Sequence, residues 1–425
     1  MSNDLKTTSI WRRIRGVGAV VGPGLVTAAV VLGPGSITVS SKCGALMGYS
    51  VLWTVLAAAV MMVVYTVMGA RIGMVAPESL LTTVAGRYGR WLAVLLGLSA
   101  FLITTGFQTG NNLGVGLALT ELVGGSVGLW AAVFTAVALA FMWFARSLYR
   151  LLERMMVLLV AVMIVAFVGN LLMIRPDVGG LARGFVPSKP AIFGLVVAIS
   201  ATTFSVAAAA FQAYLVRAKG WKEPDLRRGT RDSVTGICAL AGISMVIMIT
   251  AATVLQPAGI TITSAVDMAR QLEPLLGPLA KWLFLIGLWA GAFSSFIINA
   301  MIGGVMMADG LGIGEHLESR WAKILGTAVM LLGTVVALAF GRNPIQLLVM
   351  AQGTTIIAVP LIAIVMSMLA NDRALMGKHR NSVGMNVVAA VALGWLLFLS
   401  FNQVRILAEK YRESVGKQQA VVQVQ

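Results

Sequence analysis

VLGPGSITVSSKCG, residues 31–44, interrupts an apolar run that is long enough to cross a membrane. The triplet Gly33 to Gly35 places a proline where a spanning helix should continue, and proline both removes a backbone donor and breaks a helix. The residues after it carry hydroxyl groups and one lysine, but no acid. The stretch therefore predicts a helix broken within the membrane, with a packing bend as the alternative interpretation.

The composition identifies the class of protein around this stretch. Of the 425 residues, 58% are hydrophobic and only 11% are charged, which is too apolar for a soluble globule of this size. We expect an all-α polytopic membrane protein embedded in a lipid bilayer, with spans of about 20 residues. Eleven spans are predicted, at 17–47 (broken), 50–72, 91–123, 128–145, 153–174, 191–216 (broken), 234–255, 278–308, 323–341, 344–369 and 382–403.

The formal charge of +16 follows the membrane topology. If the N-terminus is cytoplasmic, most Lys and Arg residues fall in cytoplasmic segments, as the positive-inside rule requires. This distribution argues against nucleic acid as a partner and predicts a multi-pass protein of the cell (inner) membrane. The basic tail at 404–425 would lie outside, against the rule, so the orientation of the last span stays open. Cys43 and Cys238 lie in apolar segments and indicate neither a disulfide framework nor a zinc site.

A second interruption is predicted in the sixth span, FGLVVAISATTFSVAAAAFQAYLVRAKGW at 193–221. Ser200, Thr202, Thr203 and Ser205 cluster there at mid-depth, five spans after the first break. Unwound backbone is tolerated in hydrocarbon only around a filled cavity, and paired breaks indicate a transporter with a midplane binding site. Hydroxyl clusters also mediate helix packing, which is the alternative interpretation.

The chain resembles the NRAMP divalent-metal transporters over nearly its whole length. The resemblance rests on GPGLVTAAVVLGPGS (22–36), GALMGYSVLW (44–53), GARIGMV (69–75), LFLIGLWAGAFSSFI (283–297) and LLVMAQGTTIIAVPLIAIVMSMLANDRALMG (347–377). It implies a LeuT-type fold of two inverted five-helix repeats, at 17–174 and 191–369. An eleventh helix at 382–403 and the tail at 404–425 would complete a single transporter domain.

The resemblance fails where the family binds its metal. The family has Asp-Pro-Gly-Asn at its first break, whereas this chain has Gly33-Pro34-Gly35-Ser36. The family's Met-Pro-His in the sixth span falls on Ser205-Val206-Ala207. An acidic pair after the first break becomes Thr38 and Ser40, and only the glutamine of the tenth span is kept, as Gln352. Three positions of the family's proton route fall on Gln108, Asn111 and Gln212, and the arginine of the ninth span falls near Gly326.

These replacements predict a site for an anion. A divalent cation normally needs a carboxylate, and a soft metal needs thioether, thiolate or imidazole. A helix N-terminus instead carries roughly half a positive charge and offers free N–H groups. We expect the second halves of the broken helices to begin near Ser36 and after Ser205. The predicted substrate-binding residues are Gly33, Gly35, Ser36, Thr38, Thr202, Thr203, Ser205 and Gln352.

Four further residues are expected along the access path, namely Lys42, Gln108, Asn111 and Gln212. Lys42 lies four residues after Thr38 and therefore on the same helical face, although it can equally extend to the outer headgroups. Ser294 and Ser295 are candidates for a site that binds a coupling ion, sodium being one possibility.

The sequence favours a secondary transporter of a small oxyanion, with bicarbonate as the preferred substrate, and implies no cofactor and no bound metal. Uptake of a small neutral polar solute is the first alternative, and residual manganese or magnesium transport is the second. A sensor or scaffold without transport activity is disfavoured by the absence of a sizeable soluble domain. An enzyme is disfavoured because no nucleophile, base and orienting group converge. The substrate, the coupling ion, the direction of transport and the oligomeric state stay open.

Overall fold

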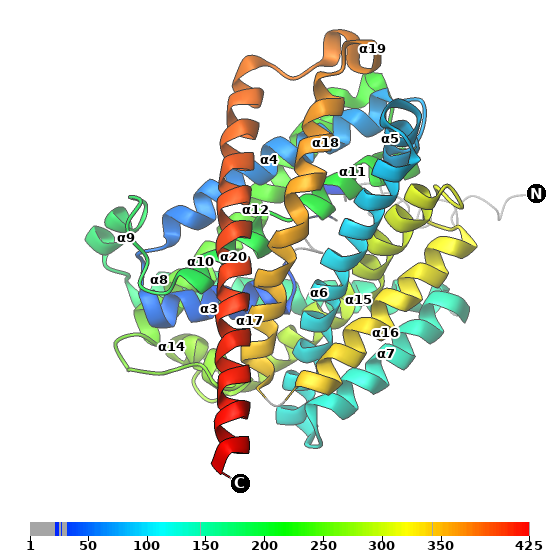
Figure 1. Cartoon of the computed structure of the whole chain (residues 1–425). Coiled ribbons are helices and arrows are strands. Elements are labelled where there is room, and N and C mark those ends of the chain that lie inside the picture. The colour runs from blue at the N-terminus through cyan, green and yellow to red at the C-terminus, as the bar shows by residue number, and fades with distance from the viewer. Residues whose placement is uncertain (1–21, 25–26, 28–31, 145, 342, 425) are drawn as a thin grey trace, which may run out of the picture.

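The computed structural model describes residues 22–24, 27, 32–144, 146–341 and 343–424, and the described chain is helical with short connections (Figure 1). Ten helices or helix pairs in it are long and apolar enough to cross a membrane. They confirm the second to eleventh predicted spans. The start of the first predicted span, at 17, lies outside the described residues. The ten are Leu52–Val75, Arg90–Val123, Val127–Phe144, Arg154–Ile174, Phe193–Ala218, Glu223–Val254, Leu279–Leu311, Arg320–Phe340, Pro344–Asn371 and Val383–Glu409.

The helices of these ten spans, together with α3 from the first predicted span, have the following bounds. They are α3 (Pro34–Met47), α4 (Leu52–Val75), α6 (Arg90–Val123), α7 (Val127–Phe144), α8 (Arg146–Ile174), α10 (Phe193–Thr203), α11 (Val206–Ala218), α12 (Leu226–Val254), α15 (Leu279–Leu311), α16 (Arg320–Phe340), α17 (Pro344–Thr354), α18 (Val359–Asn371) and α20 (Val383–Val424). Short helices that were not predicted lie in the connections: α5 (Leu80–Tyr88), α9 (Val178–Gly184), α13 (Ala265–Ala269), α14 (Glu273–Leu276) and α19 (Arg373–Met376).

The first break ends where α3 begins. Gly33 is the N-cap in an extended conformation, and Pro34 is the first helical residue. Proline is well suited to this position, because its missing N–H would have had no partner in the helix. The half-helix therefore begins at Pro34, two residues earlier than the predicted start near Ser36.

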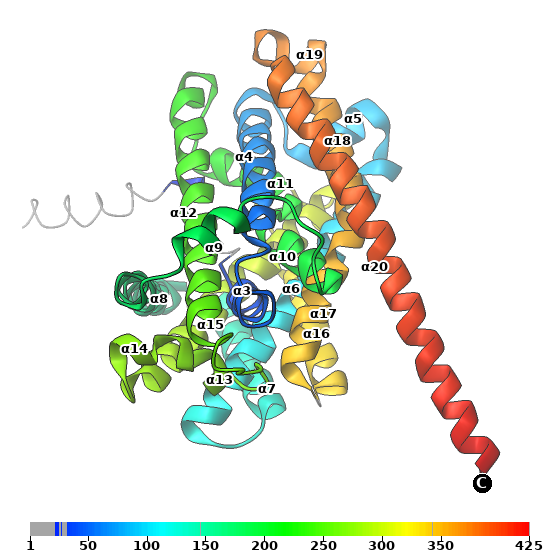
Figure 2. The ribbon, with the colours of Figure 1, turned by 90° about the vertical axis from the view of Figure 1, so that its left-hand side faces the viewer.

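The second break lies between α10 and α11 and confirms the interruption predicted near residues 201–205. Phe204 and Ser205 have non-helical backbone angles, although neither is a glycine or a proline. The span that contains both half-helices is the most enclosed of the ten, with 89% of its apolar window buried. In Figure 2, α3 is seen nearly end-on close to the centre, with α10 and α11 beside it. The two breaks thus lie inside the protein, where other elements can supply their polar partners.

The tenth span is confirmed, but it was predicted without a break and the structure interrupts it. The α17 helix ends at Thr354, a 3₁₀ turn covers Thr355–Ala358, and α18 begins at Val359 with Pro360 in its first turn. Proline cannot donate the backbone hydrogen bond that an unbroken helix would require at this position. The α17 helix, which carries Gln352 near its end, packs against α3 and α10.

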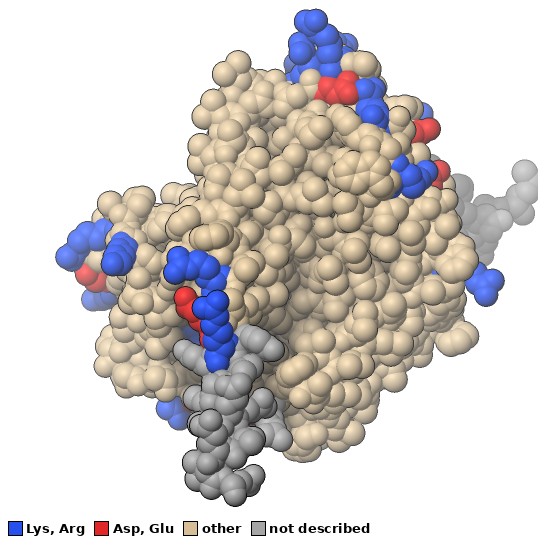
Figure 3. Space-filling model, in the orientation of Figure 1, with Lys and Arg blue, Asp and Glu red and all other residues tan. Residues whose placement is uncertain are grey.

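Charged side chains lie at the margins of the molecule. In Figure 3 they gather near α5 and α19, near α9 and along the far part of α20, and a broad uncharged surface lies between. Large apolar residues on the spanning helices are exposed, such as Leu102 on α6 and Val165 and Leu172 on α8. An exposed apolar belt of this kind is the surface that a bilayer covers. The α20 helix continues beyond the predicted end of its span at 403, so that 404–424 extends the same helix.

Candidate functional site

One face of α6 passes the starts of both half-helices. Gly114 contacts Pro34 at the start of α3, because a Cβ at Gly114 would lie 2.4 Å from the Pro34 Cβ. Phe107 lines a small cavity together with Ser205, the N-cap of α11. Residues 107 and 114 are two turns apart, or about 10 Å at 1.5 Å per residue. The N-termini of α3 and α11 therefore approach the same stripe of α6.

The carboxamide of Gln352 fills the space between these elements. A Cβ at Gly35, the second residue of α3, would lie 2.6–2.9 Å from its three terminal atoms. A Cβ at Gly110, on α6, would lie 2.3 Å from its Nε2. Real Cβ atoms do not approach so closely, so both glycines are needed for Gln352 to occupy this position. The structure thus brings the predicted residues Gly35 and Gln352 together.

Several buried oxygen atoms in this region have no hydrogen-bond partner within the described part of the chain. They are Thr38 Oγ1 and Ser40 Oγ on α3, Ser200 Oγ and Thr203 Oγ1 on α10, and Gln352 Oε1 on α17. These three helices pack against one another. Buried polar atoms are normally paired, so this concentration indicates a place where a ligand or water supplies the missing partners. Ser200 was noted in the cluster but was not among the predicted binding residues.

Ser205 lies at the start of α11, as predicted, and its hydroxyl makes no cap hydrogen bond. It lines a cavity of about 20 Å³ with Thr104, Phe107 and Asn299. This volume holds about one water molecule. The site is closed in this structure, and a larger ligand requires the half-helices or Gln352 to move.

A chain of neutral polar side chains leads away from this cavity, across α6, α15, α16 and α7. Asn299 Nδ2 donates to Gln108 Oε1 at 3.1 Å, and Gln108 Nε2 donates to Asn112 Oδ1 at 3.4 Å. Asn112 Nδ2 donates to Thr334 Oγ1 at 2.9 Å, and Thr334 pairs with Thr135 at 2.8 Å. Gln108 belongs to this chain. Its place on an access path stays a prediction.

Sequence reasoning missed Asn112, Asn299, Thr135 and Thr334, because these partners are up to 222 positions apart. A polar residue inside an apolar span was the only signal that could have found them. Asn111 is buried on the same helix, but it takes no part in these hydrogen bonds.

Gln212 holds the segment that precedes the first break. With its amide oriented to satisfy both ends, Nε2 donates to Thr27 Oγ1 at 2.6 Å and to Pro23 O at 3.1 Å. Its Oε1 accepts from Gly24 N at 3.1 Å. Gln212 therefore holds these residues against α11. Its place on an access path stays a prediction.

The remaining predicted residues are less closely associated with the breaks. Thr202 Oγ1 donates to Ile199 O within its own helix, at 3.1 Å, and Lys42 is only partly buried. The hydroxyls of Ser294 and Ser295 donate to Gly291 O, at 3.1 and 3.0 Å. Ser294 nevertheless lines an apolar cavity of about 200 Å³ that also contacts Leu32, next to the first break. Ser36 is buried on α3 and has hydrogen-bonding or electrostatic contacts of its own.

Asp309, a buried acid in the described chain, serves a structural role away from the breaks. Asp309 on α15 accepts from Ser79 Oγ at 2.8 Å, Leu81 N at 3.0 Å, Thr82 Oγ1 at 2.7 Å and Tyr214 Oη at 2.5 Å. It thereby caps α5, whose own N-cap residue makes no side-chain cap bond. Over the described ranges, no three His, Cys, Asp or Glu side chains come together as metal ligands.

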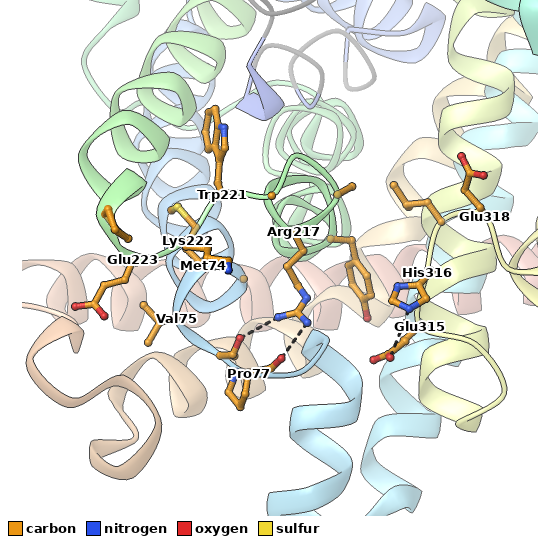
Figure 4. Close-up of a pocket in the computed structure, with 17 residues that line it drawn as sticks. Met74, Val75, Pro77, Arg217, Trp221, Lys222, Glu223, Glu315, His316 and Glu318 are labelled. Atoms are coloured by element: carbon orange, nitrogen blue, oxygen red, sulfur yellow. Dashed lines mark hydrogen bonds and ion pairs between the residues drawn. The ribbon is translucent and has the colours of Figure 1, made fainter.

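A cavity of about 840 Å³ lies at the far end of α11 (Figure 4). Arg217 projects into it and donates to the carbonyl oxygens of Ala76 and Pro77, at 2.9 and 3.0 Å. His316 faces it and lies 3.7 Å from Glu315. Its lining carries both charge signs, so the cavity has no strong preference for anions or cations.

A model of the Natural resistance-associated macrophage protein-like family, Nramp, matches residues 24–404. The chain belongs to the Nramp family. Two curated relatives are named divalent metal cation transporter MntH. The one from Deinococcus radiodurans is 26% identical, over 88% of this chain and 86% of its own length. The one from Klebsiella pneumoniae is 26% identical, over 89% of this chain and 94% of its own length. Nramp membership makes this chain a multi-pass membrane transporter rather than an enzyme, as the sequence predicted.

Solved structures agree on the fold. A mutant of the manganese transporter of Eremococcus coleocola aligns with a TM-score of 0.72 at 17% identity, covering 94% of this chain and 88% of that one. MhsT in complex with L-phenylalanine aligns with a TM-score of 0.57 at 16% identity, covering 89% of this chain and 98% of that one. Mhp1, a nucleobase-cation-symport-1 transporter, aligns with a TM-score of 0.53 at 14% identity, covering 92% of this chain and 93% of that one. The fold matches Nramp and LeuT-fold transporters, whereas the internal inverted symmetry and its repeat boundaries stay predictions.

Proposed function

We propose that this Nramp protein is a secondary transporter of a small oxyanion, with bicarbonate as the favoured substrate. It would lie in the cell (inner) membrane with a cytoplasmic N-terminus. The observation that carries the proposal is the approach of two half-helix N-termini to one stripe of α6. Nearby helices carry hydroxyls that have no partner among the described residues. Each N-terminus carries roughly half a positive charge and presents N–H groups. Thr38 and Thr203 can donate from their hydroxyls.

The residues at the two breaks argue against a metal cation. The first break reads Gly33-Pro34-Gly35-Ser36, where the family pattern has an aspartate and an asparagine. The second reads Ser205-Val206-Ala207, where that pattern has methionine and histidine. A divalent ion held by hydroxyls and one amide alone would recover little of its hydration free energy. The neutral chain from Asn299 to Thr135 has no titratable side chain that would relay protons.

Divalent metal transport is the second candidate, and the names of the relatives favour it. A neutral polar solute is a third, because hydroxyls and amides suit it equally well. The three candidates differ in how the charge of the site affects their binding. Only an anion gains binding free energy from the positive ends of the two half-helices.

Uptake into proteoliposomes separates the candidates. The purified protein is reconstituted and supplied with labelled bicarbonate, a neutral amino acid or manganese, each with and without sodium and pH gradients. The proposal predicts saturable bicarbonate uptake above protein-free vesicles and no manganese uptake. Saturable manganese uptake without bicarbonate uptake would establish the second candidate instead.

A further inference from the structure

The acceptor end of the Gln352 carboxamide is unused in the closed site. Gln352 is 1% exposed, and its Oε1 has no hydrogen-bond partner in the described chain. The carboxamide lies against the second residue of α3, as the contacts at Gly35 require. An unpaired buried carbonyl is costly, so a group that carries a donor is expected to complete this site when it is occupied.

The polar groups of the neighbouring helices indicate which kind of ligand would carry that donor. The start of α3 offers N–H donors, and α3 and α10, which pack against α17, also carry the buried hydroxyls of Thr38 and Thr203, which can donate. Gln352 Oε1 can only accept. A ligand that complements both kinds of group needs several acceptor oxygens, a negative charge and one O–H group. These are the properties of a monoprotonated oxyanion.

We propose that Gln352 Oε1 accepts the O–H of the transported oxyanion and thereby selects bicarbonate over unprotonated anions of the same shape. This inference rests on the proposed function and makes Gln352 a residue that determines specificity. Nitrate is the sharpest comparison, because it is also planar and monovalent but has no O–H. With the carboxamide in the observed orientation, nitrate would leave Oε1 unpaired and place an oxygen lone pair against it. The expected discrimination is about tenfold to a hundredfold in apparent affinity.

The test compares two anions in proteoliposomes of the full-length protein at one fixed pH. Apparent KM values are measured for labelled bicarbonate and for labelled nitrate. The variant Gln352→Met keeps most of the side-chain volume but removes the acceptor. Gln403→Met is the matched control, because Gln403 is also buried but its amide faces α17 rather than α3. A Cβ at Gly353, on α17, would lie 3.5 Å from the Gln403 Nε2.

The wild type should prefer bicarbonate by about tenfold or more. Gln352→Met should lose most of this preference through weaker bicarbonate affinity, with nitrate affinity little changed, whereas Gln403→Met should keep it. Equal affinities in the wild type would overturn the inference but leave anion transport standing. Uptake of neither anion would refute the proposed function itself.

The variants decide the role of Gln352. An unchanged preference in Gln352→Met, or loss of both anions from a folded protein, contradicts the assignment to selectivity. Folding is checked by monodispersity and melting temperature. If Gln352→Met does not fold, Gln352→Asn withdraws the acceptor from α3 and should produce the same loss of preference.

Discussion

Replacing Ser205 by alanine should weaken substrate affinity without weakening the fold. Ser205 is the N-cap of α11, a position at which loss of a capping hydroxyl usually costs about 0.5–2 kcal/mol of stability. Its hydroxyl makes no cap bond here and faces a cavity instead. Ser205→Ala should therefore leave the melting temperature close to that of the wild type.

The expected loss of affinity follows from the bond that the hydroxyl would donate to an anion. A hydrogen bond to a charged group contributes about 1.5–3 kcal/mol. Its removal should raise the apparent KM for bicarbonate by roughly one to two orders of magnitude. Uptake into proteoliposomes gives the KM, and thermal unfolding of the detergent-solubilised protein gives the stability.

Ser319 supplies the matched control, because it is a serine N-cap that does cap its helix. Its side chain accepts from Ala322 N at the start of α16. Ser319→Ala should lower the melting temperature and leave the KM unchanged, the reverse of Ser205→Ala. If Ser205→Ala instead lowers the melting temperature as Ser319→Ala does and leaves the KM unchanged, Ser205 has only a structural role and the site is wrongly placed.

Three further predictions concern the breaks and the polar chain. Gly33→Asp restores a carboxylate at the first break and should abolish bicarbonate uptake by charge repulsion; wild-type uptake by the folded, membrane-inserted variant would contradict this. Gly35→Ala should also reduce uptake, because its Cβ must displace the Gln352 carboxamide, whereas Gly242→Ala, with nothing within 4 Å, should leave uptake unchanged and raise the melting temperature slightly. Equal uptake by the Gly35 and Gly242 variants would show that the position of Gln352 is unimportant. Lowering the external pH at a fixed bicarbonate concentration should not stimulate transport, because the chain from Asn299 to Thr135 cannot carry a titrating proton; a steep acid stimulation measured in proteoliposomes would count against it.

Much of the fold could be read from the sequence, because membrane spans are local apolar runs. The described spans match predicted runs, and the Gly-Pro-Gly triplet places the start of α3 within two residues. The second break is less obvious, since Phe204 and Ser205 include neither glycine nor proline. It was found because polar residues clustered at mid-depth in an apolar span.

The interruption of the tenth span and the arrangement of the site were not predictable in the same way. Pro360 lies in the first turn of α18, where proline is compatible with a helix, so it gives no clear local signal for the 3₁₀ turn before it. The contact of Gln352 with Gly35 and Gly110 joins segments that are distant in sequence. Such contacts depend on how whole helices pack, which periodicity and composition do not encode.

Uptake of labelled bicarbonate in the presence of a strong metal chelator tests the central claim most directly. Wild-type proteoliposomes are compared with protein-free vesicles at fixed pH and bicarbonate concentration, with and without the chelator, and manganese uptake is measured in the same preparation. The account predicts saturable bicarbonate uptake that the chelator does not change, and no manganese uptake. Bicarbonate uptake no greater than in protein-free vesicles, together with saturable manganese uptake, would contradict it.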